Sequence, residues 1–249
     1  MASLTRSLDP TQFPILTIPV HLLPDYPKAL KDRLKNHQGT HVVTLNAEMT
    51  MQGRTRPELG DIIRRSELVI PDGAGIVLYL KLYGKTIDRV PGIELSEGLL
   101  KHIAQTQDSV FFYGGSPEVA DQAATVMQAK YPGLQIVGVE NGFVTHEQMP
   151  ELCDRLSQLQ PRLIYVGLGV PRQELWIAQH RYLCPNAIWI GIGGSFDIWA
   201  GTKVRAPQWL CDRNLEWTYR LYQEPWRWKR MMALPKFAWR SIVYRITGR

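Results

Sequence analysis

The chain has 249 residues, of which 45% are hydrophobic and 21% charged, and its formal net charge is +6. These proportions exclude a wholly disordered chain and fit one large α/β domain, or one domain with an appendage. The three cysteines stand far apart with no CxxC pair. This spacing argues against a disulfide framework or a zinc knuckle and favours a reducing, cytoplasmic compartment.

No segment of the sequence has the character of a membrane-spanning helix. The longest uncharged run, Tyr182 to Phe196, has 15 residues and contains Pro185 and three glycines, so it is too short to cross a bilayer as a helix. The apolar patch near the N-terminus is interrupted by prolines and lacks a signal-peptide cleavage site. We interpret it as a first strand, Ile15–Val20.

Short apolar runs typical of buried strands follow along the chain. Amphipathic stretches separate them, and the clearest predicted helix spans Pro117–Lys130, with Ser116 as its N-cap. Strands that alternate with helices predict a Rossmann-like α/β fold with a mostly parallel, doubly wound sheet. The further predicted strands are His41–Leu45, Leu68–Pro71, Val110–Tyr113, Gln135–Val139, Leu163–Gly167 and Ala187–Ile192.

The composition changes near residue 205. We place an α/β core at 1–208 and a helical, basic, Trp-rich C-terminal appendage at 209–249. The last 30 residues carry eight Lys or Arg and one acid, a net +7, whereas the other 219 residues sum to −1. Five of the eight tryptophans also lie in the appendage. Composition leaves three interpretations open: a segment that binds anionic lipid, a nucleic-acid arm, or a packed helix with buried aromatics.

Glycine-rich turns and polar residues follow five of the predicted strands. In an open parallel sheet, ligands bind beyond the carboxyl ends of the strands, where helix N-termini present free N–H groups. Ordinary tight turns explain any one of these glycines. Five such strand ends in one chain favour a nucleotide-type ligand.

The usual nucleotide motifs are nevertheless missing from the sequence. Arg172 stands where a dinucleotide fingerprint needs its third glycine, and the chain has no Walker motif. No Asp-x-Asp pair is present to hold a metal ion on a sugar-nucleotide diphosphate. We therefore expect no cofactor and no bound metal, and we expect arginines or helix N-termini to stabilise a leaving diphosphate.

Asp72 is the leading candidate for a general base. It follows a predicted strand and precedes Gly73 and Gly75, so its carboxylate is expected to face the crevice. An aspartate at this position also suits the N-cap of a helix that starts near Gly75, and the residues alone leave both roles open. Glu174 and Asp197 are weaker candidates for the same role.

A series of motifs stands in order between about residue 15 and about residue 232, and each motif alone is weak. The series is Thr44-x-Asn46, Ile70-Pro-Asp72-Gly-x-Gly75, Arg89-Val-x-Gly92, Phe112-Tyr-Gly114-Gly115, Gly167-Leu-Gly169-x-Pro-x-Gln173-Glu174, Gly193-Gly-x-Phe-Asp197, Arg205-Ala-Pro207 and Glu216-Trp217-x-x-Arg220-Leu-x-x-Glu224-Pro225-x-Arg227-x-x-Arg230. Taken together and in this order, the motifs resemble those of the WecG/TagA/CpsF glycosyltransferases.

This resemblance implies an inverting, metal-independent hexosyltransferase of cell-surface polysaccharide synthesis. The expected donor is a UDP-sugar, with N-acetylmannosamine or a related hexose, and the expected acceptor is a polyprenyl-diphosphate-linked sugar. The resemblance implies that Asp72 is the base. It places four residues in the substrate pocket, Thr44, Asn46, Arg89 and Gln173. It also places three arginines of the appendage on the diphosphate, Arg220, Arg227 and Arg230. We also expect substrate contacts from Gly114, Gly115, Gly169, Glu174 and Asp197.

The further expected partner is an anionic membrane surface, with the protein peripheral on the inner face of the cell membrane. We expect no nucleic-acid partner, and a homo-oligomer stays open. Two other functions are alternatives. A nucleotide-dependent oxidoreductase lacks support because the dinucleotide fingerprint is missing. A non-catalytic membrane or nucleic-acid adaptor would need only the appendage and would leave the crevice residues without a purpose.

Overall fold

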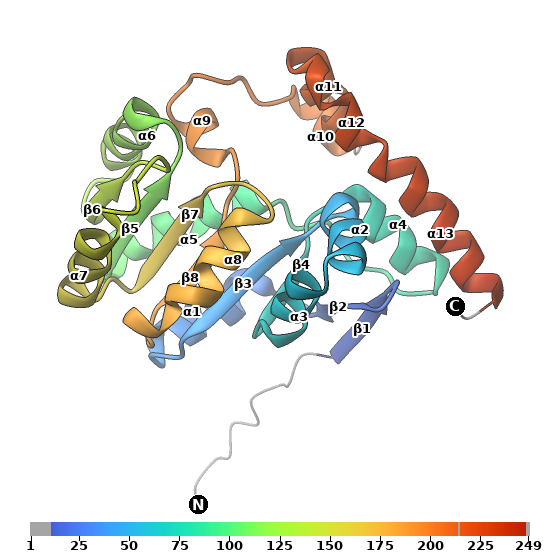
Figure 1. The fold of residues 1–249 in the computed structure, drawn as a ribbon, viewed down its shortest axis with the longest axis horizontal. Coiled ribbons are helices and arrows are strands. Elements are labelled where there is room, and N and C mark those ends of the chain that lie inside the picture. Colours follow the sequence, from blue (N-terminus) through green and yellow to red (C-terminus); the bar gives the residue numbers. More distant parts are fainter. Residues whose placement is uncertain (1–10, 214, 248–249) are drawn as a thin grey trace, which may run out of the picture.

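The computed structural model describes residues 11–213 and 215–247. The predicted core, 1–208, and the predicted appendage, 209–249, each include residues outside these ranges. Arg249, which the basic charge of the appendage includes, is one of those residues. The described chain forms a six-stranded sheet and a two-stranded hairpin, with helices around them (Figure 1). The predicted Rossmann-like, doubly wound α/β fold is confirmed.

The six strands of the main sheet lie in the order β4-β3-β8-β7-β5-β6, and every neighbouring pair is parallel. Their ends differ from the predicted ones by at most one residue. Because the strands are parallel, all their carboxyl ends meet at one edge of the sheet. The strands are β3 (Thr40–Leu45), β4 (Leu68–Pro71), β5 (Ser109–Gly114), β6 (Gln135–Glu140), β7 (Leu163–Gly167) and β8 (Ile188–Gly191).

The predicted first strand, Ile15–Val20, is wrong. The segment is a hairpin of β1 (Thr11–Ile15) and β2 (Ile18–Leu22), which pair antiparallel outside the main sheet. Its turn residues Leu16 and Thr17 have φ of 49° and 83°, a conformation that neither residue type signals in a sequence. The hairpin lies along the edge strand β4, where the N–H of Val69 donates to Nδ1 of His21 at 2.9 Å.

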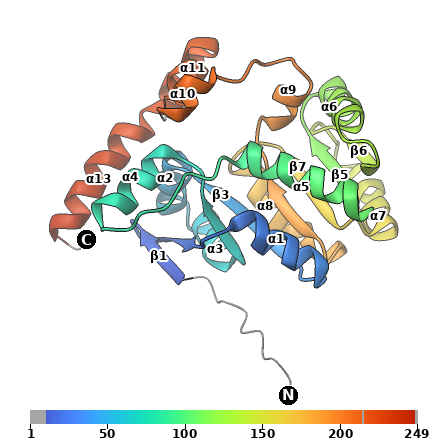
Figure 2. The ribbon, with the colours of Figure 1, turned by 180° about the vertical axis from the view of Figure 1, so that it is seen from behind.

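Helices cover both faces of the sheet (Figures 1 and 2). Side chains alternate along each strand, so Val42 packs into one layer and Val43 into the other. The predicted helix Pro117–Lys130 is confirmed, although the side chain of Ser116 makes no capping hydrogen bond. One layer holds α1 (Tyr26–Lys35), α5 (Gly92–Thr106) and α6 (Pro117–Lys130), and the other holds α2 (Ala47–Thr55), α3 (Pro57–Arg65), α4 (Ala74–Leu82), α7 (Met149–Leu159) and α8 (Arg172–His180).

The chain continues from the sheet in a series of helices. The last of them packs on α2, and its Phe237 is buried beside Tyr79 with ring centroids 6.0 Å apart. Among the described residues, none of the helices is both long and apolar enough to cross a bilayer. The helices are α9 (Ser195–Trp199), α10 (Gln208–Asp212), α11 (Glu216–Gln223), α12 (Trp228–Met231) and α13 (Ala233–Thr247), with 3-10 turns at Arg181–Leu183 and Pro225–Arg227.

The packed-helix interpretation of the appendage fits only part of it. Phe237 is 4% exposed, whereas Trp239, two residues further along α13, is 67% exposed. The other four tryptophans of the appendage are also exposed. The segment is thus anchored on the core and presents aromatic rings outward, and the division at 208/209 stays a prediction.

Candidate active site

Asp72 lies directly after β4, at the carboxyl edge of the sheet. Its N–H donates to the carbonyl of Leu45 in β3 at 3.0 Å. Its Oδ1 accepts from the N–H of Gly92, the first residue of α5, at 3.1 Å. Asp72 therefore does not cap α4, whose N-cap is Gly73. No described residue donates to Oδ2, and the side chain is 24% exposed, so this oxygen is open to a ligand.

Arg89 lies beside Asp72 and binds its backbone. Nε of Arg89 donates to the Asp72 carbonyl at 2.6 Å, and a terminal guanidinium nitrogen lies 3.9 Å from Oδ1. Burial raises the pKa of Asp72 above its ordinary value and outweighs the positive charges of Arg89 and Arg220, while Glu216 adds to the rise. A carboxylate with a raised pKa accepts a proton more readily, which suits a general base.

Thr44 and Gln173 meet at Gly191, the last residue of β8. Oγ1 of Thr44 donates to the Gly191 carbonyl at 3.4 Å. A Cβ on Gly191 would lie 2.3 Å from Nε2 of Gln173, so a larger residue there would displace the Gln173 amide. A Cβ on Gly92 would lie 3.1 Å from the methyl group of Thr44. Thr44 thus fills the space between Gly92, the hydrogen-bond partner of Asp72, and the end of β8.

Gln173 joins two glycine turns. Its Oε1 accepts from the N–H of Gly169 at 3.1 Å and from that of Gly193 at 3.0 Å. Its Nε2 donates to Oε1 of Glu174 at 2.8 Å, and Oε2 of Glu174 has no partner among the described residues. Both side chains are buried. Burial raises the pKa of Glu174 to about 7. Substrate contact by these residues stays a prediction, and their visible role is to hold the turns after β7 and β8 together.

Asn46, Gly114 and Gly115 shape the same edge of the sheet. Oδ1 of Asn46 caps α2 by accepting from the N–H of Met49 at 2.9 Å. Gly114 ends β5 and Gly115 follows it, with φ of +131° and +72°, a conformation that favours glycine. Contacts of these three residues with a substrate stay predictions.

Each predicted diphosphate-binding arginine pairs with a carboxylate. Glu216, at the start of α11, accepts from Arg220 and also from Arg89, the latter at 2.7 Å. Arg227 lies 2.9 Å from Glu224. Arg230 binds Glu48 of α2 with hydrogen bonds of 2.8 and 3.2 Å.

Asp197 lies on α9 and reaches the appendage through a lysine. Lys203 lies 3.4 Å from Asp197 and 3.2 Å from Glu224. Ion pairs therefore tie the appendage to the core through Arg89, α2 and Lys203, in addition to the packing of α13 on α2 and α4. Figure 1 shows α10, α11 and α12 above the edge at which the strands end.

Glu216 stands in the last motif of the sequence, but no role was predicted for it there. It stands four residues before Arg220, the helical spacing that lets a carboxylate pair with a guanidinium. That spacing in the sequence indicates the pairing of Glu216 with Arg220. Its contact with Arg89, 127 positions away in the chain, had no sequence signal.

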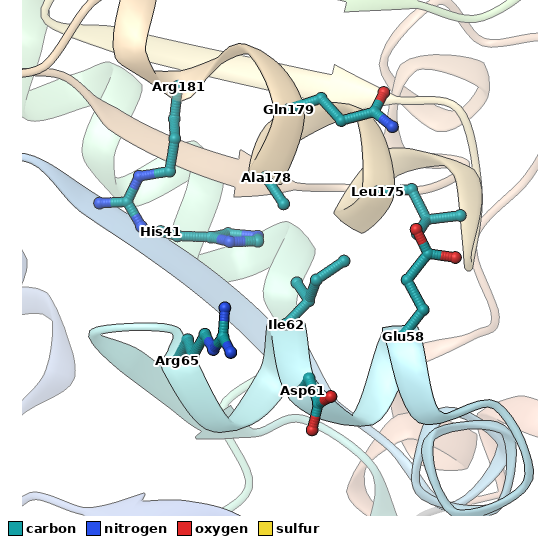
Figure 3. A pocket seen from close by; sticks show the side chains of 9 residues that line it. All are labelled: His41, Glu58, Asp61, Ile62, Arg65, Leu175, Ala178, Gln179 and Arg181. Atoms are coloured by element: carbon teal, nitrogen blue, oxygen red, sulfur yellow. The ribbon is translucent and has the colours of Figure 1, made fainter.

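A separate cleft of ≈ 460 Å³ lies between α3 and α8 and contains none of the predicted site residues (Figure 3). In it His41 is almost fully buried, and burial lowers its pKa to about 3, so its ring is neutral. Arg181 is held by Glu67 through two hydrogen bonds of 2.9 Å. The cleft is lined by His41, Glu58, Asp61, Ile62, Arg65, Leu175, Ala178, Gln179 and Arg181.

A Rossmann-like sheet with an open carboxylate and several arginines at its carboxyl edge is an arrangement suited to group transfer from a nucleotide. The chain belongs to the WecG/TagA/CpsF family of glycosyltransferases, whose family description, "Glycosyl transferase WecG/TagA/CpsF family", matches residues 13–249. It is therefore a glycosyltransferase.

Two similar proteins carry the same name, N-acetylglucosaminyldiphosphoundecaprenol N-acetyl-beta-D-mannosaminyltransferase. The protein from Bacillus spizizenii is 35% identical over 205 residues, which are 82% of this chain and 79% of the relative. The protein from Bacillus subtilis (strain 168) is 33% identical over 201 residues, 80% of this chain and 78% of the relative.

The buried carboxyl of Glu174 predicts a dependence of stability on pH. Its pKa of about 7 in the folded state exceeds the ordinary 4.5, so the folded protein binds the proton more tightly than the unfolded chain. The Glu174 contribution to stability is therefore fully present below pH 4.5 and is lost as pH rises through 7. The stability of the wild type relative to Glu174→Gln should fall by about 3 kcal/mol between pH 4.5 and pH 8. Urea unfolding at a series of pH values measures it, and parallel curves would contradict the prediction.

Proposed function

We propose that this glycosyltransferase moves N-acetylmannosamine from a UDP-sugar onto N-acetylglucosamine linked to a polyprenyl diphosphate. The observation that carries the proposal is the shared name of the two relatives, at 35% and 33% identity over about four-fifths of the chain. That name states the sugar transferred and the lipid-linked acceptor. The site supports a nucleotide sugar as the donor, because a Rossmann-like sheet offers glycine turns and helix N-termini to a diphosphate.

Asp72 is the proposed general base. Its free Oδ2 accepts the proton of an acceptor hydroxyl group while that oxygen forms a bond to the anomeric carbon of the donor. The bond from this carbon to the UDP oxygen breaks, and UDP leaves with the bonding electrons. Attack opposite to the leaving group inverts the anomeric configuration. The raised pKa of Asp72 and the exposure of its carboxylate support this role.

Arginines are proposed to stabilise the leaving diphosphate without a metal ion. In residues 11–213 and 215–247, no group of three or more His, Cys, Asp or Glu side chains is placed to bind a metal. Arg220 and Arg230 are each nearly half exposed, so they keep N–H groups available to phosphate oxygens. Guanidinium groups bind phosphate with charge-assisted, paired hydrogen bonds.

Asp72→Asn should lower the transfer rate by about 10²–10⁴. The amide keeps the size of the carboxylate and can still accept from the N–H of Gly92, but it cannot take the acceptor's proton at neutral pH. Affinity for UDP should change much less. The assay follows transfer to a polyprenyl-diphosphate-GlcNAc analogue by mass spectrometry, with UDP binding and thermal unfolding measured on the same variant. Near-normal turnover would remove Asp72 from the mechanism.

Transfer should continue in the presence of a metal chelator, because arginines and not a metal ion stabilise the leaving UDP. The measurement compares initial rates in EDTA and after added Mn²⁺ or Mg²⁺. A rate that is abolished by EDTA and restored by either ion would contradict the arginine-based mechanism.

We also propose that the appendage binds the inner, anionic face of the cell membrane. Its exposed aromatic residues include Trp226 at 69%, Tyr222 at 81% and Trp239 at 67%. They are interspersed with Lys and Arg, a combination suited to the headgroup region of a bilayer. Binding by this surface leaves the core beside the membrane and supports a peripheral location.

The double variant Trp226→Ala, Trp239→Ala should weaken binding to anionic liposomes about tenfold or more, because two large apolar side chains leave the interface. The matched control replaces Phe143 and Tyr182, which are 70% and 71% exposed on the core, and should bind as the wild type does. Co-sedimentation with phosphatidylglycerol vesicles measures both variants. Equal binding of all three proteins would show that the appendage is not the membrane contact.

A further inference from the structure

We infer that Glu216 is a positioning residue, which fastens the appendage to the core at Arg89 and thereby holds Arg220 near enough to Asp72 for its charge to act on that carboxylate. This inference rests on the proposed function, because it assigns Glu216 to the same site. The side chain does not have to touch a substrate. It acts through the two arginines that it binds.

The geometry of Glu216 is that of a bridge. Its two carboxylate oxygens bind different guanidinium groups, Oε2 that of Arg89 and Oε1 that of Arg220. Arg89 in turn donates to the backbone carbonyl of Asp72. A continuous chain of contacts therefore runs from Asp72 in the core to α11 in the appendage.

Because Glu216 and Arg89 are mostly buried, their charged side chains are more stable when paired than when apart. The side chain of Glu216 is 6% exposed, and that of Arg89 is 18% exposed. Arg220 and Arg89 hold the pKa of Glu216 below its ordinary value although burial alone would raise it. Removing one member would leave a charge in a poorly solvated position without its partner, which is strongly unfavourable.

Arg220 depends on Glu216 more than Arg89 does. Among the described residues, Glu216 is the only hydrogen-bond or ion-pair partner of the Arg220 side chain, whereas the Arg89 side chain also binds Asp72. Arg220 is 47% exposed. Without Glu216, no other described contact would keep its guanidinium group near Asp72.

The test is the variant Glu216→Gln, which keeps the size of the side chain and removes its charge. Glu67→Gln is the matched control, since Glu67 is also a partly buried carboxylate held by an arginine, Arg181, which lines the cleft between α3 and α8. Hydrogen exchange on the full chain should be at least tenfold faster for the α11 amides in Glu216→Gln and unchanged there in Glu67→Gln. Unchanged exchange of the strand amides shows in the same experiment that the variant is folded.

The pH dependence of transfer separates positioning from a simple loss of charge. Arg89, Arg220 and Glu216 are the charged groups that act on Asp72. If the arginines stay in place, losing the negative charge of Glu216 lowers the pKa of Asp72, and the acid limb of the rate profile moves to lower pH. If Arg220 moves away, as we expect, the pKa rises and the limb moves to higher pH.

The outcomes distinguish the inference from the proposed function. Unchanged exchange in α11, or an acid limb at lower pH, would overturn the role of Glu216 even in an active transferase. A wild type that transfers no sugar would overturn the proposed function, and the exchange measurement would still decide whether Glu216 fastens the appendage.

Discussion

Parallel pairing of β4 with β3, and of β3 with β8, places Asp72, Thr44 and Gly191 at one edge of the sheet. The register aligns Leu45 with Pro71, so the turn after β4 begins with the hydrogen bond from the Asp72 N–H to the Leu45 carbonyl. This bond directs the carboxylate toward the N-terminus of α5. The position of the proposed base is thus set by strand register, and a slip of one residue would turn it to the other face.

The electrostatic balance of this edge requires the appendage. Arg89 is mostly buried, and a buried cation needs a charged or strongly polar partner. From the core, the Arg89 guanidinium has a neutral acceptor, the Asp72 carbonyl, at 2.6 Å, and a carboxylate, that of Asp72, only at 3.9 Å. The close carboxylate comes from Glu216 of α11. Together with Phe237 of α13, which fills part of the core beside Tyr79, this contact joins α11 and α13 to the core.

The sequence predicted the sheet because several of its strands are continuous apolar runs, and this pattern is local. It also predicted Asp72 and Arg89 as site residues, through their place in an ordered series of motifs. The β1–β2 hairpin was missed because Leu16 and Thr17 adopt positive φ without the glycine or asparagine that usually marks such a turn. The bonds of Gln173 to Gly169 and Gly193, and of Glu216 to Arg89, depend on tertiary packing. No local pattern encodes them.

The two sides of the appendage have different chemistry, and helix geometry explains how one segment carries both. Phe237 and Trp239 are two residues apart, which is about 200° around a helix, so one faces α2 and α4 while the other faces away. Arg230 reaches inward to Glu48 of α2, and Arg220 pairs with Glu216 of its own helix, which in turn binds Arg89 of the core. Under the proposed function, the outward tryptophans rest at the depth of the lipid headgroups. The diphosphate of a lipid-linked acceptor lies at that same depth, and the arginines then stand between it and Asp72.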